Sequence, residues 1–194
     1  MRVARDTRTP TRMQSVSNDT FGPLVAYLVP GATVLTGLSP FLPVVQTWLE
    51  GSTKDAPTIG GLLYLSLASL AAGMTVSAIR WAVVDTLHAG TGLKPPKLNF
   101  VRLHGRVDEL RLLIEMHYRH YQFYANMLVA VFIAYGGYRI HVGIAPPGLA
   151  DVAVFLLEPI FFLTSRDTLR KYYTRSRQLL SREPPPQRSR APVA

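Results

Sequence analysis

The chain has 194 residues, 48% of them hydrophobic, and a formal net charge of +9. The absence of cysteine excludes disulfides, thiolate catalysis and cysteine metal sites. A strongly basic chain suits either nucleic acid or an anionic membrane surface. Here the apolar residues form four blocks flanked by the charges, and the basic segments lack the interleaved aromatic residues of a nucleic-acid module. We therefore expect a membrane protein that contacts an anionic leaflet and binds no nucleic acid.

Residues 1–20 carry four arginines among small polar residues and hold no apolar run. This composition predicts a disordered basic arm, available to anionic lipid or to a partner, and argues against a cleavable signal peptide. The first apolar block follows, and its part 21–39 is long enough to span a bilayer. Pro30 lies near its middle and predicts a kink, because proline has no N–H to donate.

The second block, 60–79, holds twenty residues without a charge. At ~1.5 Å per residue a helix of this length measures ~30 Å, the thickness of a bilayer core. It stops at Arg80 and Trp81, residue types that sit at a membrane interface, although the helical pattern continues to about His88. Small residues recur four apart along it: Ser69, Gly73 and Ser77. This spacing lets another helix approach closely, either from the same chain or from a second copy.

A helical pattern resumes at Val107 and runs into the third uncharged block, 121–138. We therefore expect the second and third membrane helices to form one long hairpin. Its inner part, 80–120, extends into the cytoplasm in this interpretation.

The fourth apolar block covers 147–164, and a basic amphipathic segment, 165–181, follows it. We expect this segment to lie as a helix on the anionic leaflet, where its cations bind lipid or a partner. Those cations are Arg166, Arg170, Lys171, Arg175 and Arg177. The last residues, 182–194, are rich in proline and predict a disordered tail.

Four spans place both termini and the middle loop on one side of the membrane. Nineteen Lys and Arg residues fall on that side, and only Lys54 and Arg139 fall on the other. The positive-inside rule then puts both termini in the cytoplasm. The sequence thus predicts an all-α polytopic protein of the inner (cytoplasmic) membrane, with a four-span domain over 21–164. The excess of Arg over Lys suits a GC-rich bacterial genome.

Glu158 is an ionisable residue near the middle of the fourth span. A charge there costs on the order of ~3 kcal/mol, so the side chain is expected to face a cavity, a polar group or a neighbouring subunit. One interpretation is a gating, pore-lining or proton-responsive group. The other is a structural hydrogen bond near the carbonyl of Phe155, which Pro159 leaves without its helical donor.

A second set of polar residues lies on the expected cytoplasmic side. Its members are Asp85, His88, Arg111, Glu115, His117 and His120. Asp85 and His88 share one helix face, as do His117 and His120, so an in-register hairpin brings carboxylates and imidazoles together. The spacing does not match the Glu-x-x-His pairs of di-metal bundles, and we assign no metal site. An interfacial belt or a polar network that joins Asp85, Arg111 and Glu115 explains the set better, and we favour the network.

Motifs of common catalytic and nucleotide-binding sites are missing from the sequence, including GxSxG, the P-loop, GxGxxG and HExxH. We therefore assign no catalytic residue and no cofactor. The first hypothesis is a homo-oligomer that forms or regulates a membrane pore. The alternative is an anchor or adaptor whose basic cytoplasmic face binds a soluble protein or anionic lipid. The third is a membrane-embedded enzyme that uses the Asp/His/Glu cluster.

Overall fold

The computed structural model describes residues 13–54, 59–98, 103 and 105–181, and within these ranges the chain forms helices and no strand. The all-α prediction is therefore confirmed for the described part. The expected tail, 182–194, and the first twelve residues of the expected arm lie outside it. Residues 13–20, which we assigned to the arm, form the beginning of the first helix.

The helices follow one another as α1 (Met13–Leu38), η1 (Ser39–Phe41), α2 (Pro43–Lys54), α3 (Ile59–Arg80), η2 (Trp81–Asp85), α4 (Thr86–Gly90), α5 (Val107–Leu113), η4 (Ile114–Tyr118), α6 (Arg119–Val142) and α7 (Leu149–Ser181). Two of them, η2 and η4, are single turns of π-helix that join their neighbours without a break. The chain therefore forms one continuous helix over 59–90 and another over 107–142. The segment 165–181 is likewise the second half of α7.

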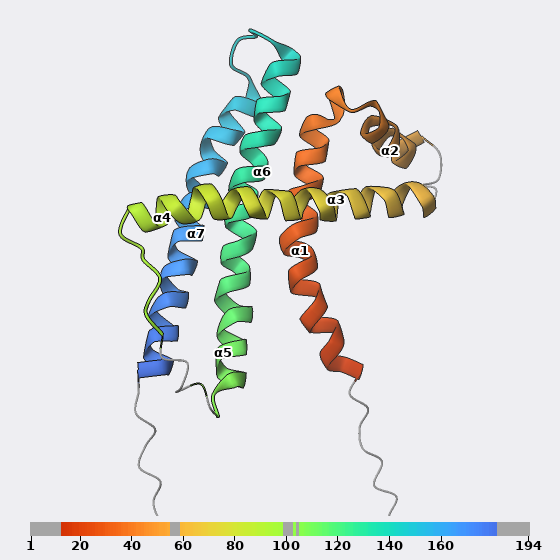
Figure 1. Cartoon of the computed structure of the whole chain (residues 1–194). Coiled ribbons are helices and arrows are strands. Elements are labelled where there is room, and N and C mark those ends of the chain that lie inside the picture. The colour runs from red at the N-terminus through yellow and green to blue at the C-terminus, as the bar shows by residue number, and fades with distance from the viewer. Residues whose placement is uncertain (1–12, 55–58, 99–102, 104, 182–194) are drawn as a thin grey trace, which may run out of the picture.

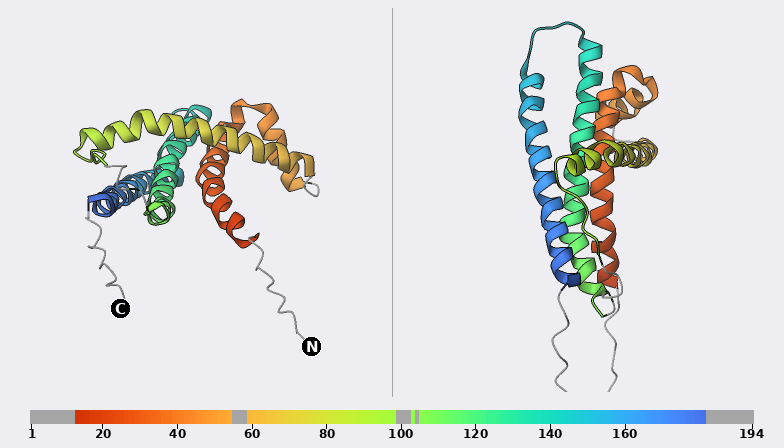
Figure 2. Two further views of the ribbon diagram at one scale, coloured as in Figure 1. Left: turned by 60° about the horizontal axis from the view of Figure 1, so that its bottom comes forward. Right: turned by 60° about the vertical axis from the view of Figure 1, so that its left-hand side comes forward.

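Helices α1, α6 and α7 lie side by side, and the continuous helix formed by α3, η2 and α4 runs across all three (Figure 1). The side view separates these two directions and shows α6 and α7 as an antiparallel pair joined at one end (Figure 2). The hairpin expected between the second and third apolar helices is therefore wrong, because α6 lies along α1 and α7, whereas α3 only crosses it.

That contact brings the backbones of α1 and α3 together at glycine. A Cβ atom added to Gly31 would lie 1.7 Å from the carbonyl oxygen of Ser69, and one added to Gly73 would lie 1.9 Å from that of Tyr27. The small residues of α3 thus serve packing within the chain, which is one of the two alternatives that their spacing allowed. α2 covers the other end of α3, where Trp48 stacks on Tyr64 with ring centroids 6.1 Å apart.

α1 also packs closely on α6, and a polar side chain of α6 supplies the hydrogen-bond donor that a proline removes from α1. Pro30 cannot donate to the carbonyl of Ala26, four residues earlier. The fully buried Asn126 of α6 donates to that carbonyl from its side-chain amide at 3.0 Å. This bond is the kind of compensation that makes proline tolerable inside a membrane helix.

Two stretches in the described residues are long and apolar enough to cross a membrane, Leu24–Phe41 and Ile59–Gly90. Only 17% of the second stretch is buried, so large apolar side chains face outward along most of it. A core helix of a soluble protein is instead mostly buried. The α6 and α7 stretches do not reach the same apolar content.

Candidate functional site

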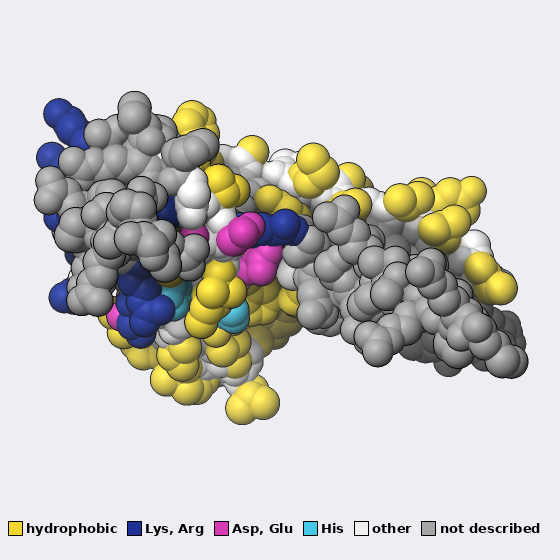
Figure 3. Space-filling view, turned by 90° about the horizontal axis from the view of Figure 1, so that it is seen from below, with side chains coloured by type: hydrophobic (Ala, Val, Ile, Leu, Met, Phe, Trp, Pro, Cys, Tyr) yellow, Lys and Arg dark blue, Asp and Glu magenta, His cyan; other side chains and the backbone are white. Residues whose placement is uncertain are grey.

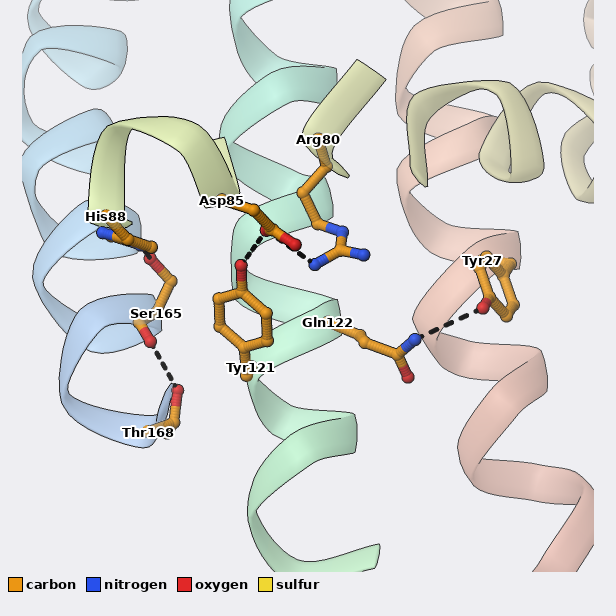
Figure 4. A network of polar contacts seen from close by, with 8 residues as sticks. All are labelled: Tyr27, Arg80, Asp85, His88, Tyr121, Gln122, Ser165 and Thr168. Atoms are coloured by element: carbon orange, nitrogen blue, oxygen red, sulfur yellow. Dashed lines mark hydrogen bonds and ion pairs between the residues drawn. The ribbon is translucent and has the colours of Figure 1, made fainter. Parts of the chain in front are cut away.

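The helix over 59–90 ends in a buried polar junction with α6 and α7 (Figure 4). Its first element is an ion pair between Arg80 and Asp85, with Nη1 and Oδ1 3.0 Å apart. Residues five apart meet on one side of a π-turn, whereas an α-helix turns them well away from each other. The π-turn η2 therefore creates this pair, and only 5% of the Arg80 side chain is exposed.

Tyr121 of α6 closes the junction from the other side. Its hydroxyl donates to Asp85, and the Arg80 guanidinium lies over its ring, 5.2 Å from the centroid. Asp85 thus accepts from two donors, while 31% of its own side chain stays exposed. Burial of an arginine is costly unless it is paired in this way, so removal of one partner should destabilise the junction strongly.

His88, on α4, connects the same junction to α7. The residue is 1% exposed, and its Nε2 lies 3.2 Å from the hydroxyl oxygen of Ser165. Ser165 itself donates to the carbonyl of Phe162 at 2.9 Å, so the hydrogen of the histidine contact belongs to Nε2. Nδ1 is then a bare acceptor, and it is buried with no hydrogen-bond partner. Burial, followed by the charge of Arg166, lowers the pKa of His88 below its usual 6.5, which favours the neutral imidazole.

The remaining members of the expected cluster form separate contacts on α5, η4 and α7. Arg111 pairs with Glu115 at 3.3 Å, and their side chains are 59% and 38% exposed. His117 accepts from Arg175 of α7 at 2.6 Å, and His120 is exposed. Burial, followed by the charges of Arg175 and Lys171, lowers the pKa of His117 below its usual 6.5. The described residues contain no group of three or more His, Asp or Glu that could hold a metal ion.

Glu158 lies on the face of α7 that contacts α6. Seven residues before it, Asp151 accepts from the hydroxyl of Tyr135 at 2.5 Å, and three residues after it, Phe161 meets the ring of Tyr124 with centroids 6.5 Å apart. Glu158 is half-buried, and its Oε1 is buried with no hydrogen-bond partner. The carboxylate thus faces another helix of its own chain.

Seen from below, Lys and Arg side chains gather at one end of the molecule (Figure 3). Those that the sequence assigned to lipid binding lie on α7. Several are already engaged. Arg166 donates to the carbonyl of Thr91 at 2.9 Å, and Lys171 pairs with Asp167 at 2.6 Å. Arg170 and Arg177 are exposed. These two cations are the members of the expected lipid-binding set that point most freely to the surroundings.

The sequence did not reveal the roles of Arg80, Tyr121 and Ser165. Arg80 looked like an interfacial cation, because a pattern of 3.6 residues does not pair it with Asp85. Ser165 and His88 are 77 residues apart, and only the crossing of the two helices joins them. Comparison with known protein families, with characterised proteins and with solved structures gave no match, so function has to be inferred from this geometry.

Proposed function

We propose that the chain is a small integral protein of the bacterial cytoplasmic membrane that self-associates and forms or regulates a pore. The observation that carries this proposal is Glu158, whose Oε1 is buried without a partner in an otherwise apolar stretch of α7. A carboxylate in such a position is costly, and an ionisable residue inside the membrane is by default a candidate for an ion pathway. In this proposal segments 21–39, 60–79, 121–138 and 147–164 span the membrane, with both termini in the cytoplasm.

The four-span arrangement requires a change in the direction of the helix over 59–90, which runs across α1, α6 and α7 (Figure 1). In the membrane α3 has to stand closer to the direction of the other three. Such a reorientation would separate His88 from Ser165 and Tyr121 from Asp85, so this span is proposed from the apolar length of 59–90 and against the crossed arrangement.

Self-association requires a surface that is not already used within the chain. The contact between α1 and α3 already uses the small residues Gly31, Ser69 and Gly73. The outer face of α7 offers large exposed apolar side chains, with Phe155 78% and Leu163 63% exposed. In a pore of several copies this face meets lipid or the neighbouring subunit, and it is the surface we assign to the homo-oligomer.

The test combines mass and flux on the full chain. The mass in mild detergent should be that of an oligomer, and liposomes that hold the protein should release K⁺ or protons. Glu158→Gln should change the flux, whereas Glu115→Gln, an exposed carboxylate on η4, should not. A monomeric mass together with sealed liposomes would overturn the proposal.

An anchor or adaptor is the second candidate, and the exposed cations Arg170 and Arg177 favour it. In that role the inner half of α7 binds anionic lipid or a cytoplasmic protein, and Glu158→Gln is silent. Co-sedimentation with anionic and neutral vesicles separates the two candidates, since Arg170→Gln with Arg177→Gln should then abolish the preference for anionic vesicles. The enzyme hypothesis ranks third, because its expected residues form two sets of contacts.

A further inference from the structure

We propose that a groove between α1 and α6 binds one glycerophospholipid of the cytoplasmic leaflet, with the lipid phosphate on Arg119 and an acyl chain along the apolar part. This inference rests on the membrane location in the proposed function, but it requires neither a pore nor self-association. The groove consists of two cavities between the same two helices. One measures about 300 Å³ and borders Gly22 and Arg119, and the other measures about 640 Å³ and borders Ala32 and Ala134.

The two cavities lie on the same face of both helices. On α1 the lining residues Val25, Val29 and Ala32 follow one another at spacings of four and three. On α6 the lining residues Phe123 and Ala134 are eleven positions apart, which corresponds to about three helical turns. The cavities are therefore two parts of one groove that follows the contact between α1 and α6.

The groove does not depend on the direction of the helix over 59–90. That helix meets α1 at Tyr27 and Gly31, each of which lies two positions after a groove residue, Val25 or Val29. Two positions correspond to a rotation of about 200° around an α-helix. The crossing helix and the groove thus occupy opposite sides of α1, and a change in the direction of that helix leaves the groove intact.

Arg119 provides the cation at the polar end of the groove. Its aliphatic stem lies against α1, since a Cβ atom added to Gly22 would lie 3.0 Å from the Cδ of Arg119. Glu115, the carboxylate that borders the same cavity, pairs with Arg111 at 3.3 Å. Within the described residues no hydrogen bond or ion pair engages Arg119. Its guanidinium, a planar group of five N–H donors, therefore remains available to a phosphate.

The position of Arg119 matches the depth of lipid phosphates. The residue precedes by two positions the segment 121–138, which spans the membrane in the proposed function. Gly22 lies at the corresponding end of 21–39, and α1 and α6 diverge toward this end (Figure 1). Val25 and Phe123 border the same cavity one turn farther into the membrane, so the lining changes from charged to apolar where a lipid does.

The length of the groove fits one leaflet. Ala32 lies ten residues after Gly22, which is about 15 Å along α1. The hydrocarbon core of a bilayer is about 30 Å thick, so this distance is half of it. An acyl chain whose headgroup binds Arg119 thus reaches the second cavity and ends there.

A glycerophospholipid satisfies both ends of the groove, whereas other occupants satisfy one. Inorganic phosphate pairs with Arg119 but leaves the apolar part without an occupant. Diacylglycerol fills the apolar part but leaves the guanidinium without an anion. Phosphatidylethanolamine and phosphatidylglycerol share the phosphodiester and the acyl chains, and this shared chemistry is what the groove recognises.

The experiment uses the full chain, stripped of bulk lipid in detergent and titrated with phosphatidylethanolamine, phosphatidylglycerol or diacylglycerol. Native mass spectrometry counts the lipids bound to each chain. Wild type should retain one phospholipid of either kind in preference to diacylglycerol. Equal retention of phospholipid and diacylglycerol would overturn the proposal, and this comparison needs no variant. Displacement of the phospholipid by millimolar inorganic phosphate would assign Arg119 to a soluble anion and would also overturn it.

Variants then locate the lipid in the groove. Arg119→Gln should weaken phospholipid retention about tenfold, because it removes a charged hydrogen-bond donor. Arg119→Lys should keep part of the retention, since it keeps the charge but not the planar donor group. Ala32→Phe fills the second cavity and should also weaken retention. Lys97→Gln, which removes an exposed cation from the connection after α4, should match wild type. Wild-type retention in Arg119→Gln would overturn the site.

The same preparations separate this inference from the proposed function. A monomer that retains phospholipid but leaves liposomes sealed would support the groove and overturn the pore. An oligomer whose flux depends on Glu158 but that retains no phospholipid would support the pore and overturn the groove. A chain that does not enter liposomes would overturn both.

Discussion

The two halves of the helix over 59–90 pack against the rest of the molecule through different kinds of contact, one apolar and one polar. In the α3 half, Gly73 lets backbone meet backbone, and the contact involves no charge. In the half made by η2 and α4, buried charged and polar side chains make the contacts, with Arg80 paired to Asp85 and His88 bound to Ser165. The apolar contact restricts only the size of the side chains at the crossing of α1 and α3. The polar contact demands that every partner be present, because a buried charge without its partner is far more costly than a small void.

The largest effect should therefore come from the polar half. Asp85→Ala leaves Arg80 buried without its counter-charge, and we expect a loss of about 3–5 kcal/mol in the free energy of unfolding. Glu115→Ala is the matched control, because its partner Arg111 is exposed and such pairs contribute about 0–1 kcal/mol. Denaturant titration of both variants in the same detergent measures the difference.

A further variant removes both members of the buried ion pair. Arg80→Met with Asp85→Leu removes both charges, and Tyr121→Phe removes the hydroxyl that donates to Asp85, so the combined variant should recover most of the stability that Asp85→Ala loses. A cost for Asp85→Ala no larger than that for Glu115→Ala would show that the π-turn pair does not hold the junction.

The apolar half should respond to volume. Gly73→Ala places a methyl group against the carbonyl of Tyr27, which cannot move as a side chain can, and we expect a loss of about 1–3 kcal/mol. Gly60→Ala in the same helix has nothing within 4 Å of the new atom, and it should be neutral or slightly stabilising. Thermal unfolding of the two variants makes the comparison. Equal melting temperatures would mean that α3 does not cross α1 at Gly73.

The bond from Asn126 to Ala26 tests whether a polar group supports the apolar half as well. Asn126→Ala leaves that carbonyl without a donor and should cost about 1 kcal/mol. In a Pro30→Ala background the backbone N–H of residue 30 returns to the carbonyl, so Asn126→Ala should then cost less. A double-mutant cycle measures the coupling. Additive costs would separate Asn126 from the proline.

The sequence predicted the apolar half better than the polar half, for a physical reason. The four-residue spacing of Ser69 and Gly73 is a property of one helix, so it predicts close approach without reference to the partner. The direction of approach depends on both helices, and the hairpin prediction failed there. The pair of Arg80 and Asp85 depends on a π-turn that shifts the register by one residue, which a regular helical pattern cannot anticipate. Glu158 stood out because one charge in an apolar block is visible from the sequence alone.

The smallest effect should come from the exposed counterpart of the polar junction, the contact between His117 and Arg175. Both lie outside the proposed spans, and the neutral imidazole accepts from the guanidinium at 2.6 Å. Burial and the nearby cations Arg175 and Lys171 lower the pKa of His117, so the folded chain binds fewer protons than the unfolded chain just below pH 6.5. The contribution of His117 to the free energy of unfolding is therefore fully present above pH 6.5, and it declines as the pH falls from 6.5 toward the lowered pKa.

Because the contact is exposed to solvent, the decline should amount to a few tenths of a kcal/mol. His117→Gln keeps an acceptor for Arg175 but does not titrate, so the difference between wild type and variant isolates this group from the other histidines. Melting temperatures from pH 7.5 to 5.0 should fall more steeply for wild type than for the variant. The carboxylate of Asp167, on α7, raises the pKa of His117 and so opposes its lowering. In Asp167→Asn the melting temperature should therefore fall more steeply with pH than in wild type. Parallel curves for wild type and His117→Gln would show that the titration of His117 does not affect the stability of the fold.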